Sequence, residues 1–480
     1  SLLCIAVLTA PTADIIAVDL KVEYLRNPLA VDIPQPRLQW TLQATDPTKH
    51  DLSQKAYQIL VATDRQSLDT NIGNLWDSKK VVSDRTTHIK YGGTPLKSGQ
   101  RAYWKVNVWD QNDQVQNNSC ESINYWDKGL DINDWTGQWI GAPVGTQQKA
   151  LQNLSEIDSK VIQSNPGLIP VLYLRNNFTT DSKIKSAKIY ATAQGVYKMF
   201  INNKTVGDSQ LSPGWSDYNK TFQYQAYDVT ELLLTNNAIG VLLGTGWFSS
   251  YVGFFRRYKQ YGPDQSLLFE LHIEYENNKT AIVKSDNTWK VSTGSLMYSD
   301  LLMGELYYED REVIGWTSPE FDDSHWSSVV TKEIDKNVAL IADRSQPIRV
   351  TRDLTPKTKY ESKPGVWVFD FNQNMVGWVR ISLPKTYDAT RVQLRHAEAL
   401  NPDGSIYTLN LRTALATDTY VLKKANNSYE LSLEPHFTYH GFRYVELTGY
   451  PGEPQLTNIK GMVVNSDTPF ESFFETSNEM

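Results

Sequence analysis

Two aromatic segments carry the residue types that bind sugars. One lies at 213–218 and the other at 244–248. Flat aromatic rings stack against the C–H faces of a sugar, and short polar side chains bond to its hydroxyl groups. We therefore predict that sugar contacts four side chains of these segments, namely Trp215, Asp217, Tyr218 and Trp247. The alternative is that both tryptophans are ordinary core residues.

Short strands and turns must position these segments. Residues 197–201 alternate apolar and polar side chains, which predicts a strand with one buried face. Residues 202–204 predict a turn because Asn tolerates positive φ, and a return strand begins at 205–208. Further strands are predicted at 224–229 and 238–243. This pattern favours a β-sandwich whose loops carry the aromatic residues.

Other residues with metal or acid–base potential favour structural roles. His436 and His440 could hold zinc on a helix, but residues 437–439 favour a strand or loop. No Glu stands where a metalloprotease requires its base. Two hydrogen-bonded structural pairs are predicted instead, His396 with Glu398 and Asp418 with Arg443. No phosphate-binding glycine loop, nucleophile elbow or paired-cysteine motif is found in the sequence.

Composition excludes some function classes. The 480 residues are enough for about three domains. The net charge is −7, and no basic patch is found, so a nucleic-acid partner is not expected. The 14 Trp and 26 Tyr residues suit β-rich domains and sugar recognition.

The first residues predict export from the cytoplasm. Residues 2–10 form a short apolar run that ends before Pro11, typical of the end of a secretory signal peptide. We expect a partial signal peptide at 1–13 and a secreted or periplasmic protein. The run is too short to span a bilayer, so no membrane span is expected. Cys4 lies in this run and leaves Cys120 alone, so no disulfide framework is predicted.

The whole pattern predicts an all-β protein. Strand 102–109 places Ala102, Trp104, Val106 and Val108 toward a core and leaves Lys105 and Asn107 toward water. The expected organisation is an immunoglobulin or fibronectin-like sandwich at 14–128, a jelly-roll carbohydrate-binding sandwich at 129–333 with a surface insertion at 144–168, a concanavalin-like, lectin-like sandwich at 334–466, and the start of a helical domain at 467–480.

Three stretches resemble one family, the bacterial-type alpha-L-rhamnosidases. The first runs from Gly195 through Pro213-Gly214-Trp215-Ser216-Asp217-Tyr218 to Trp247, the second is 369–378, and the third combines His396-Ala397-Glu398, Asp418-Thr419-Tyr420 and 434–444. Together they cover nearly the whole chain in the family's domain order. One departure is the segment 304–311, which is one residue longer than the family's usual motif.

The resemblance implies a glycoside hydrolase that removes terminal α-L-rhamnose with inversion. The family's catalytic carboxylates lie on a helical barrel that follows these β domains, so no catalytic residue is expected in this chain, and that catalytic domain is its expected partner. The middle sandwich resembles the family's rhamnose-binding module, which can hold calcium beside the sugar. Asp208, Asp217 and Asp228 are candidate calcium ligands, of which Asp208 and Asp228 are predicted as the metal-binding pair.

Three hypotheses therefore stand. The chain binds L-rhamnose or rhamnosylated glycans through its middle sandwich, or its domains are a purely structural scaffold without sugar binding. In the third, Glu305 with Glu309 or Asp310 forms the carboxyl pair of an inverting glycosidase, although solvated loop acids are far commoner.

Overall fold

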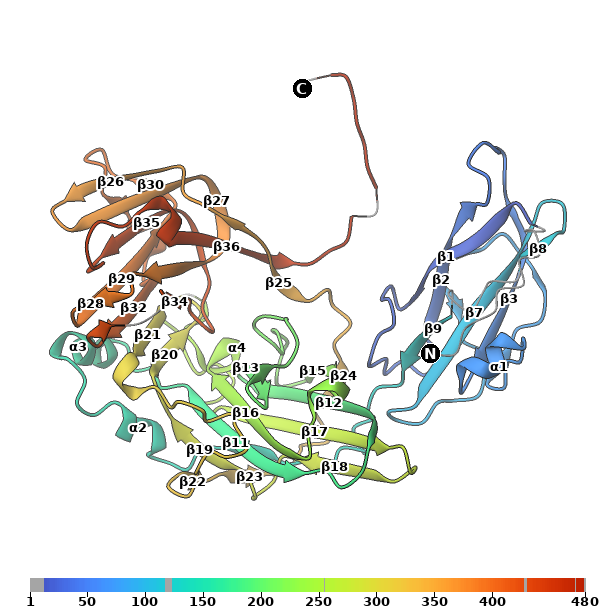
Figure 1. Ribbon diagram of the computed structural model, residues 1–480, viewed down its shortest axis with the longest axis horizontal. Coiled ribbons are helices and arrows are strands. Elements are labelled where there is room, and N and C mark those ends of the chain that lie inside the picture. The colour runs from blue at the N-terminus through green and yellow to red at the C-terminus, as the bar shows by residue number, and fades with distance from the viewer. Residues whose placement is uncertain (1–12, 117–122, 254, 427–429, 471, 479–480) are drawn as a thin grey trace. The chain divides into compact units, whose positions relative to one another are not determined.

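The computed structural model describes residues 13–116, 123–253, 255–426, 430–470 and 472–478 (Figure 1). Residues 1–12 of the expected signal segment, together with Cys4 and Cys120, lie outside the described residues. The chain divides into two compact units, Ser1–Trp135 with Leu340–Arg344 and Thr136–Ala339 with Ser345–Met480. Strands are the main regular element of both, with few and short helices, so the all-β prediction is confirmed. No described helix is long and apolar enough to cross a membrane.

The first unit is a pair of antiparallel sheets. Its elements are β1 (Ile15–Val22), β2 (Arg37–Ala44), β3 (Gln54–Ala62), α1 (Arg65–Asp69), β4 (Trp76–Asp77), β5 (Val81–Val82), β6 (Ile89–Lys90), β7 (Arg101–Asp110), β8 (Val115–Gln116) and β9 (Asn124–Asp127). One sheet has the order β1-β2-β6, and the other has β4-β3-β7-β8 with β5 on β3 and β9 on β7. Trp40, Trp104 and Trp126 lie in the core that the sheets share.

The outer face of β7 differs from the sequence prediction. Lys105 and Asn107 were expected to face water, but each is only 3% exposed. The physical reason is α1, whose Leu68 packs with Leu60 and Ala62 of β3 in a second apolar cluster on that side. Burial lowers the pKa of Lys105.

The second unit begins with a two-sheet sandwich. Its strands are β10 (Trp139–Gly141), β11 (Leu172–Thr179), β12 (Ile184–Gln194), β13 (Val196–Ile201), β14 (Lys204–Thr205), β15 (Thr221–Asp228), β16 (Asn236–Gly244), β17 (Ser266–Tyr275), β18 (Thr280–Lys284), β19 (Lys290–Thr293), β22 (Ser327–Ser328) and β23 (Val330–Lys332); β24 (Ala339–Ala342) begins at its last residue. The sheet order is β23-β10-β17-β12-β15, with β18 on β17, in one layer and β14-β13-β16-β11-β19-β22 in the other. The apolar residues between them form one core that contains Trp289. The predicted hairpin 197–208 is present as β13 and β14, joined at Asn202 and Asn203, which both have positive φ.

Short helices complete the sandwich segment. They are α2 (Thr146–Ala150), α3 (Glu156–Ser164), η2 (Thr230–Leu232), α4 (Gly246–Ser249) and η3 (Glu309–Arg311). The insertion expected at 144–168 therefore contains α2 and α3. It is not only surface, because Asp158 and Ile162 of α3 are buried.

A long sheet forms the rest of this unit. Its strands are β20 (Leu296–Asp300), β21 (Gly304–Tyr308), β25 (Ile348–Leu354), β26 (Thr358–Lys363), β27 (Val366–Leu383), β29 (Thr390–Ala397), β32 (Thr417–Leu422), β34 (Leu431–Leu433), β35 (His440–Thr448) and β36 (Ile459–Ser466). Smaller elements are β28 (Thr386–Tyr387), β30 (Ala399–Leu400), β31 (Ile406–Tyr407), β33 (Ala425–Asn426), η4 (Leu409–Leu411) and η5 (Leu456–Asn458). The described residues after β36 form neither helix nor strand.

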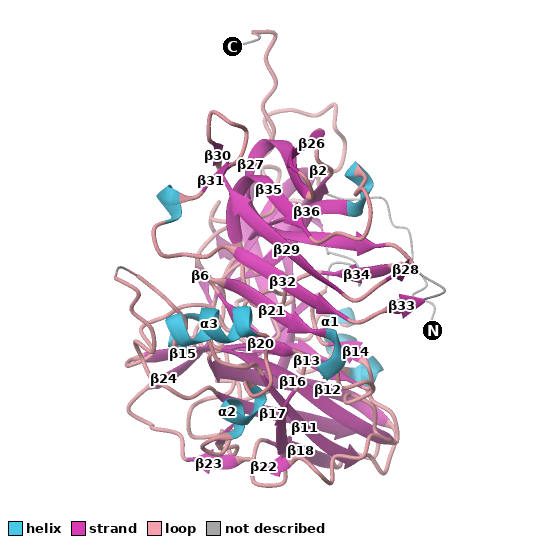
Figure 2. Cartoon of the chain, turned by 90° about the vertical axis from the view of Figure 1, so that its left-hand side faces the viewer, coloured by secondary structure: helices cyan, strands magenta, loops and turns pink. Residues whose placement is uncertain are grey.

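Sheet membership does not follow the domain boundary expected between 333 and 334. The order of the long sheet is β20-β21-β32-β29-β35-β27-β36-β25, with β26 and β34 also on β27. Figure 2 shows β20, β21, β32 and β29 succeeding one another as neighbouring arrows. β21 pairs with β32 in parallel, Leu306 opposite Thr419 and Tyr308 opposite Val421. A hairpin from the sandwich segment thus supplies the edge of the following sheet.

Candidate functional site

The loop 211–218 turns one tryptophan outward. Leu211 and Gly214 both have positive φ, and a cis peptide bond joins Ser212 to Pro213. Ser216 donates its hydroxyl to the carbonyl of Thr221 at 2.6 Å, which closes the loop. Trp215 is 57% exposed. Its ring is therefore available to stack on a ligand.

Tyr218 supports this loop from below. It is buried, and its hydroxyl donates to the carbonyl oxygen of Gly214 at 2.5 Å. Its ring centroid lies 5.3 Å from Phe222, 5.6 Å from Phe248 and 4.9 Å from Tyr261. Burial raises its pKa. Tyr218 thus fixes the loop, and the sequence prediction of direct sugar contact stays a prediction.

The remaining predicted sugar-binding residues differ in exposure. Asp217 is exposed at the loop, where its carbonyl oxygen accepts the backbone N–H groups of Lys220 and Thr221. Trp247 belongs to α4 and is only 9% exposed. The structure brings Tyr218 against Phe248 of the same helix. Trp215 is thus the predicted tryptophan with a free ring face, and Trp247 has the burial of a core residue.

The two predicted calcium ligands already have protein partners. Asp208 pairs with Arg349, Nε to Oδ2 at 2.8 Å. Asp228 accepts the backbone N–H of Thr230 at 3.0 Å and its hydroxyl at 2.7 Å, at the start of η2. Calcium requires six to eight oxygen ligands. Among the described residues no cluster of three His, Cys, Asp or Glu side chains includes either carboxylate, and calcium binding by Asp208 and Asp228 stays a prediction.

A polar pocket of about 260 Å³ lies where Asp208 meets the long sheet. Lys198 of β13 and Gln210 line it from the sandwich. Its other walls come from β25, β27 and the loop after β34, namely Arg349, Val350, Trp378, Arg380, Glu434 and Pro435. Sequence reasoning did not select these residues. The sequence feature that could have pointed to this pocket is the alternation of Trp378 and Arg380 on one strand, together with the motif that begins at Glu434.

Charged groups organise this pocket. Arg380 makes a forked pair with Glu434, with Nη2 at 3.0 Å from both carboxylate oxygens. The indole N–H of Trp378 donates to Glu434 Oε2 at 3.0 Å. Arg349 also pairs with Asp467 at 3.0 Å. The pocket offers fixed donors and acceptors beside an indole, which suits a small hydroxyl-rich ligand.

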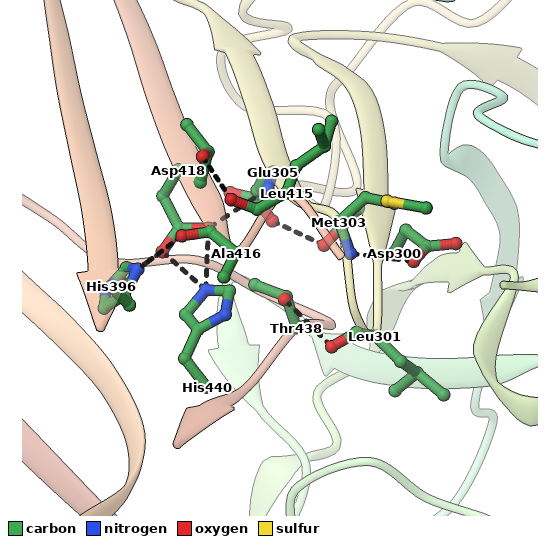
Figure 3. Close-up of polar contacts among 12 residues, drawn as sticks. Asp300, Leu301, Met303, Glu305, His396, Leu415, Ala416, Asp418, Thr438 and His440 are labelled. Atoms are coloured by element: carbon green, nitrogen blue, oxygen red, sulfur yellow. Dashed lines mark hydrogen bonds and ion pairs between the residues drawn. The ribbon is translucent and has the colours of Figure 1, made fainter. Parts of the chain in front are cut away.

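A cluster of polar side chains that project from strands of the long sheet is also buried (Figure 3). Glu305 is fully buried in β21. Its Oε2 accepts the hydroxyl of Ser299 at 2.7 Å and the backbone N–H of His436 at 2.8 Å. Its own N–H donates to Asp418 Oδ1 at 3.1 Å.

Two histidines face Asp418 from neighbouring strands. His440 Nε2 lies 3.2 and 3.1 Å from the two carboxylate oxygens. His396 stacks on His440 with centroids 4.0 Å apart. Burial lowers the pKa of each histidine to about 3 and raises that of Asp418 to about 7. Both imidazoles are therefore neutral at ordinary pH.

Several sequence interpretations are wrong here. Glu305 lies in a strand, not a loop, and is shielded from water, so it cannot act with Glu309 or Asp310 as an inverting pair across a sugar. Glu309 instead accepts the backbone N–H of Lys423 at 2.9 Å. Both predicted pairs are also wrong. His396 bonds to the carbonyl of Ala416 and not to Glu398, whose carboxylate accepts from Asn374. Arg443 pairs with Asp370 and not with Asp418.

Comparison with known proteins identifies the domains. The alpha-L-rhamnosidase N-terminal domain matches residues 182–352, the Rha78A-like N-terminal immunoglobulin domain matches 17–130, and the bacterial alpha-L-rhamnosidase concanavalin-like domain matches 360–465. The chain belongs to the bacterial alpha-L-rhamnosidase family. The resemblance predicted from the sequence is thereby confirmed.

Curated rhamnosidases match along almost the whole chain. That of Streptomyces avermitilis is 32% identical and aligns with 95% of this chain and 58% of its own length. One from Formosa agariphila is 33% identical, with 95% and 48% covered. The chain thus spans about half the length of the curated relatives it matches.

Solved rhamnosidase structures share the fold. The alpha-L-rhamnosidase from Dictyoglumus thermophilum has a TM-score of 0.83 at 32% identity and covers 95% of this chain and 50% of its own. The Streptomyces avermitilis enzyme, solved in complex with L-rhamnose, has a TM-score of 0.86 at 29% identity, with 97% and 59% covered.

Proposed function

We propose that this chain is the sugar-binding and supporting part of an alpha-L-rhamnosidase, and that it binds L-rhamnose or rhamnosylated glycans. The observation that carries the proposal is the similarity, over 97% of the chain, to a rhamnosidase solved with L-rhamnose. The exposed ring of Trp215 supports the binding part. The whole protein would hydrolyse terminal α-L-rhamnosides in a secreted or periplasmic setting, with its catalytic carboxylates supplied from outside this chain.

Two surfaces suit the sugar, and they differ in chemistry. The Trp215 loop offers an aromatic face and the exposed carboxylate of Asp217. The pocket beside Lys198 offers an ammonium group and the Arg380–Glu434 pair. A neutral deoxy sugar with an apolar methyl face favours the aromatic loop, since stacking requires no ion pair to open.

The test is isothermal titration of the chain with L-rhamnose, with and without calcium. Trp215→Ala should weaken binding at least about tenfold, the loss expected from one stacked ring, without changing the melting temperature. Lys198→Ala is the control for the pocket and should leave binding unchanged. If Lys198→Ala abolishes the heat of rhamnose binding and Trp215→Ala does not, the sugar site is the pocket and not the loop. No heat at millimolar rhamnose would contradict sugar binding.

The scaffold alternative, which the comparisons do not favour, treats the buried Tyr218 and Trp247 as structural residues only. It predicts that neither Trp215→Ala nor Lys198→Ala alters any sugar titration. An aryl α-L-rhamnoside assay addresses catalysis separately. We expect no turnover by this chain alone, because Glu305 is fully buried and already accepts hydrogen bonds from Ser299 and His436.

A further inference from the structure

Three adjacent strands bring two imidazoles and a carboxylate to one buried point. His396 lies near the end of β29, Asp418 near the start of β32, and His440 at the start of β35. β29 pairs with both other strands, with Leu394 opposite Asp418 and His396 opposite Val445. One potential ligand atom from each of the three residues lies within 4.8 Å of the others.

The distances suit a small cation. Zinc bonds to nitrogen and oxygen are about 2.0–2.1 Å, so tetrahedral ligand atoms stand ~3.4 Å apart. His440 Nε2 lies 3.1 Å and His396 Nε2 lies 3.9 Å from Asp418 Oδ2. The three ligand atoms lie within 4.8 Å of one another, so closures of up to about 1.4 Å would bring them to bonding distance of one ion.

The proton on His396 is placed as a metal ligand requires. Its Nδ1 lies 3.0 Å from the carbonyl oxygen of Ala416, and a carbonyl can only accept, so Nδ1 carries the proton. Nε2 then holds a free lone pair. A ligating histidine typically donates its other ring N–H to a backbone carbonyl in this way.

That lone pair has no hydrogen-bond partner. His396 is 1% exposed, and its Nε2 is a buried polar atom without a hydrogen bond. It faces the fully buried carboxylate of Asp418, which His440 Nε2 and the backbone N–H of Glu305 also contact. A buried acceptor without a hydrogen bond is unfavourable, and a cation between it and Asp418 would satisfy the acceptor and balance the charge of the carboxylate.

We infer that His396, Asp418 and His440 form a binding site for a divalent transition metal of the zinc class. Two imidazole nitrogens and one carboxylate oxygen select zinc over calcium or magnesium, which prefer oxygen ligands. His440 Nε2 donates to Asp418 in the metal-free chain, so binding through Nε2 would move that proton to Nδ1. The fourth position is open to a water molecule or hydroxide. The site does not depend on the proposed sugar binding.

Burial dictates how the ion enters. The ligands come from strands that meet only in the folded sheet, so binding accompanies folding and stabilises the native state. The chain should therefore be refolded from urea with zinc or with EDTA and then dialysed. Metal analysis should find about one zinc per chain only after refolding with zinc, and that sample should melt at least ~5 °C higher.

Matched variants locate the ion. His396→Gln and Asp418→Asn should each lose the bound zinc. His272→Gln is the control, because His272 lies in β17 and bonds to Glu270 at 2.6 Å. It should keep the full metal content. Equal zinc in all variants would assign binding to other side chains and overturn the proposal.

Wild-type protein provides a second measurement should the buried variants not fold. Cobalt-loaded wild-type chain should show the intense visible absorption of a four- or five-coordinate ion. Wild-type protein that retains less than about 0.1 zinc per chain after refolding, and shows no change in melting temperature, would also overturn the proposal.

Discussion

Neighbouring residues of the loop 211–218 have opposite roles. Trp215 offers its ring to solvent, while Tyr218 holds the loop through a hydroxyl bond to Gly214. Residue type alone makes both candidates for sugar binding, but it does not predict which of the two is exposed. Which of two nearby rings faces water depends on positive φ at Leu211 and Gly214.

Removing the Tyr218 hydroxyl should loosen this loop. Tyr218→Phe leaves the Gly214 carbonyl without its buried donor, which should cost about 1 kcal/mol of unfolding free energy. Urea denaturation measures this loss. Rhamnose affinity should fall less than with Trp215→Ala, because the exposed ring remains. Unchanged stability would show that solvent replaces the hydroxyl.

Gly304 is required by the close approach of two strands. It has φ +103°, and a Cβ there would lie 2.0 Å from the carbonyl oxygen of Thr417. Gly304→Ala should lower the unfolding free energy by at least ~3 kcal/mol, because both backbone strain and a clash result. Gly365→Ala is the control, since Gly365 also has positive φ but nothing within 4 Å of the added Cβ. It should cost only about 1 kcal/mol, measured in the same urea titrations.

At the scale of elements, α3 is anchored by one carboxylate. Ser155 caps the helix and donates its hydroxyl to Asp158 at 2.6 Å. Asp158 also accepts from Tyr308 at 2.7 Å and pairs with Arg391 of β29 at 2.7 Å. The sequence of the insertion is rich in Gln, Ser and Asn and does not predict that Asp158 is buried and paired. The partner stands 233 residues away, which no local pattern reveals.

Asp158→Asn should therefore destabilise the second unit by about 2–4 kcal/mol at pH 7. The control is Glu156→Gln on the same helix. Glu156 pairs with Lys160 at 2.6 Å, but both side chains are more than two-thirds exposed, so its loss should cost under about 0.5 kcal/mol. Thermal and urea unfolding compare the two variants.

The Asp158 contribution should also depend on pH. Burial alone would raise the pKa of Asp158, but its bonds with Arg391, Ser155 and Tyr308 outweigh burial and lower it below 3.8. A depressed carboxyl pKa stabilises the fold fully above the unfolded value and loses that effect as pH falls through the folded value. The stability difference between wild type and Asp158→Asn should thus be constant down to pH ~4 and shrink below it. A difference that persists to the acid limit of the folded state would argue against ionisation of Asp158.

Local alternation located strands better than it predicted which of their faces are buried. The strand 102–109 was found within a residue of β7, yet its outer face was misread because α1 covers it. The periodicity of 364–371 and of 377–383 predicts two strands, but the structure has the single strand β27 there. A register shift between Asp370 and Met375 interrupts the pairing without ending the strand. Such an irregularity is fixed by partner strands and not by local sequence.

At the scale of the whole molecule, domain order followed from the sequence and sheet membership did not. Periodicity predicts strands but not partners. β20 and β21 have the spacing of a sandwich hairpin, yet β21 pairs with β32 more than a hundred residues later. The pairing of β21 with β32 also buries Glu305 beside Asp418. The buried polar cluster therefore could not be predicted from sequence motifs alone.

This pairing predicts that the sandwich segment does not fold fully without the sheet that follows. A chain of residues 13–344 would leave the β21 edge unpaired and expose the apolar cluster that contains Leu306 and Tyr308 together with Val421. Compared with residues 13–478, it should bind more hydrophobic dye, and protease should cut it within 296–308. The physical reason is that a hairpin without its neighbouring strand is only marginally stable. If instead the shorter chain resists protease in that hairpin as well as the longer one does, the two parts are separate folding units and the shared sheet only joins them.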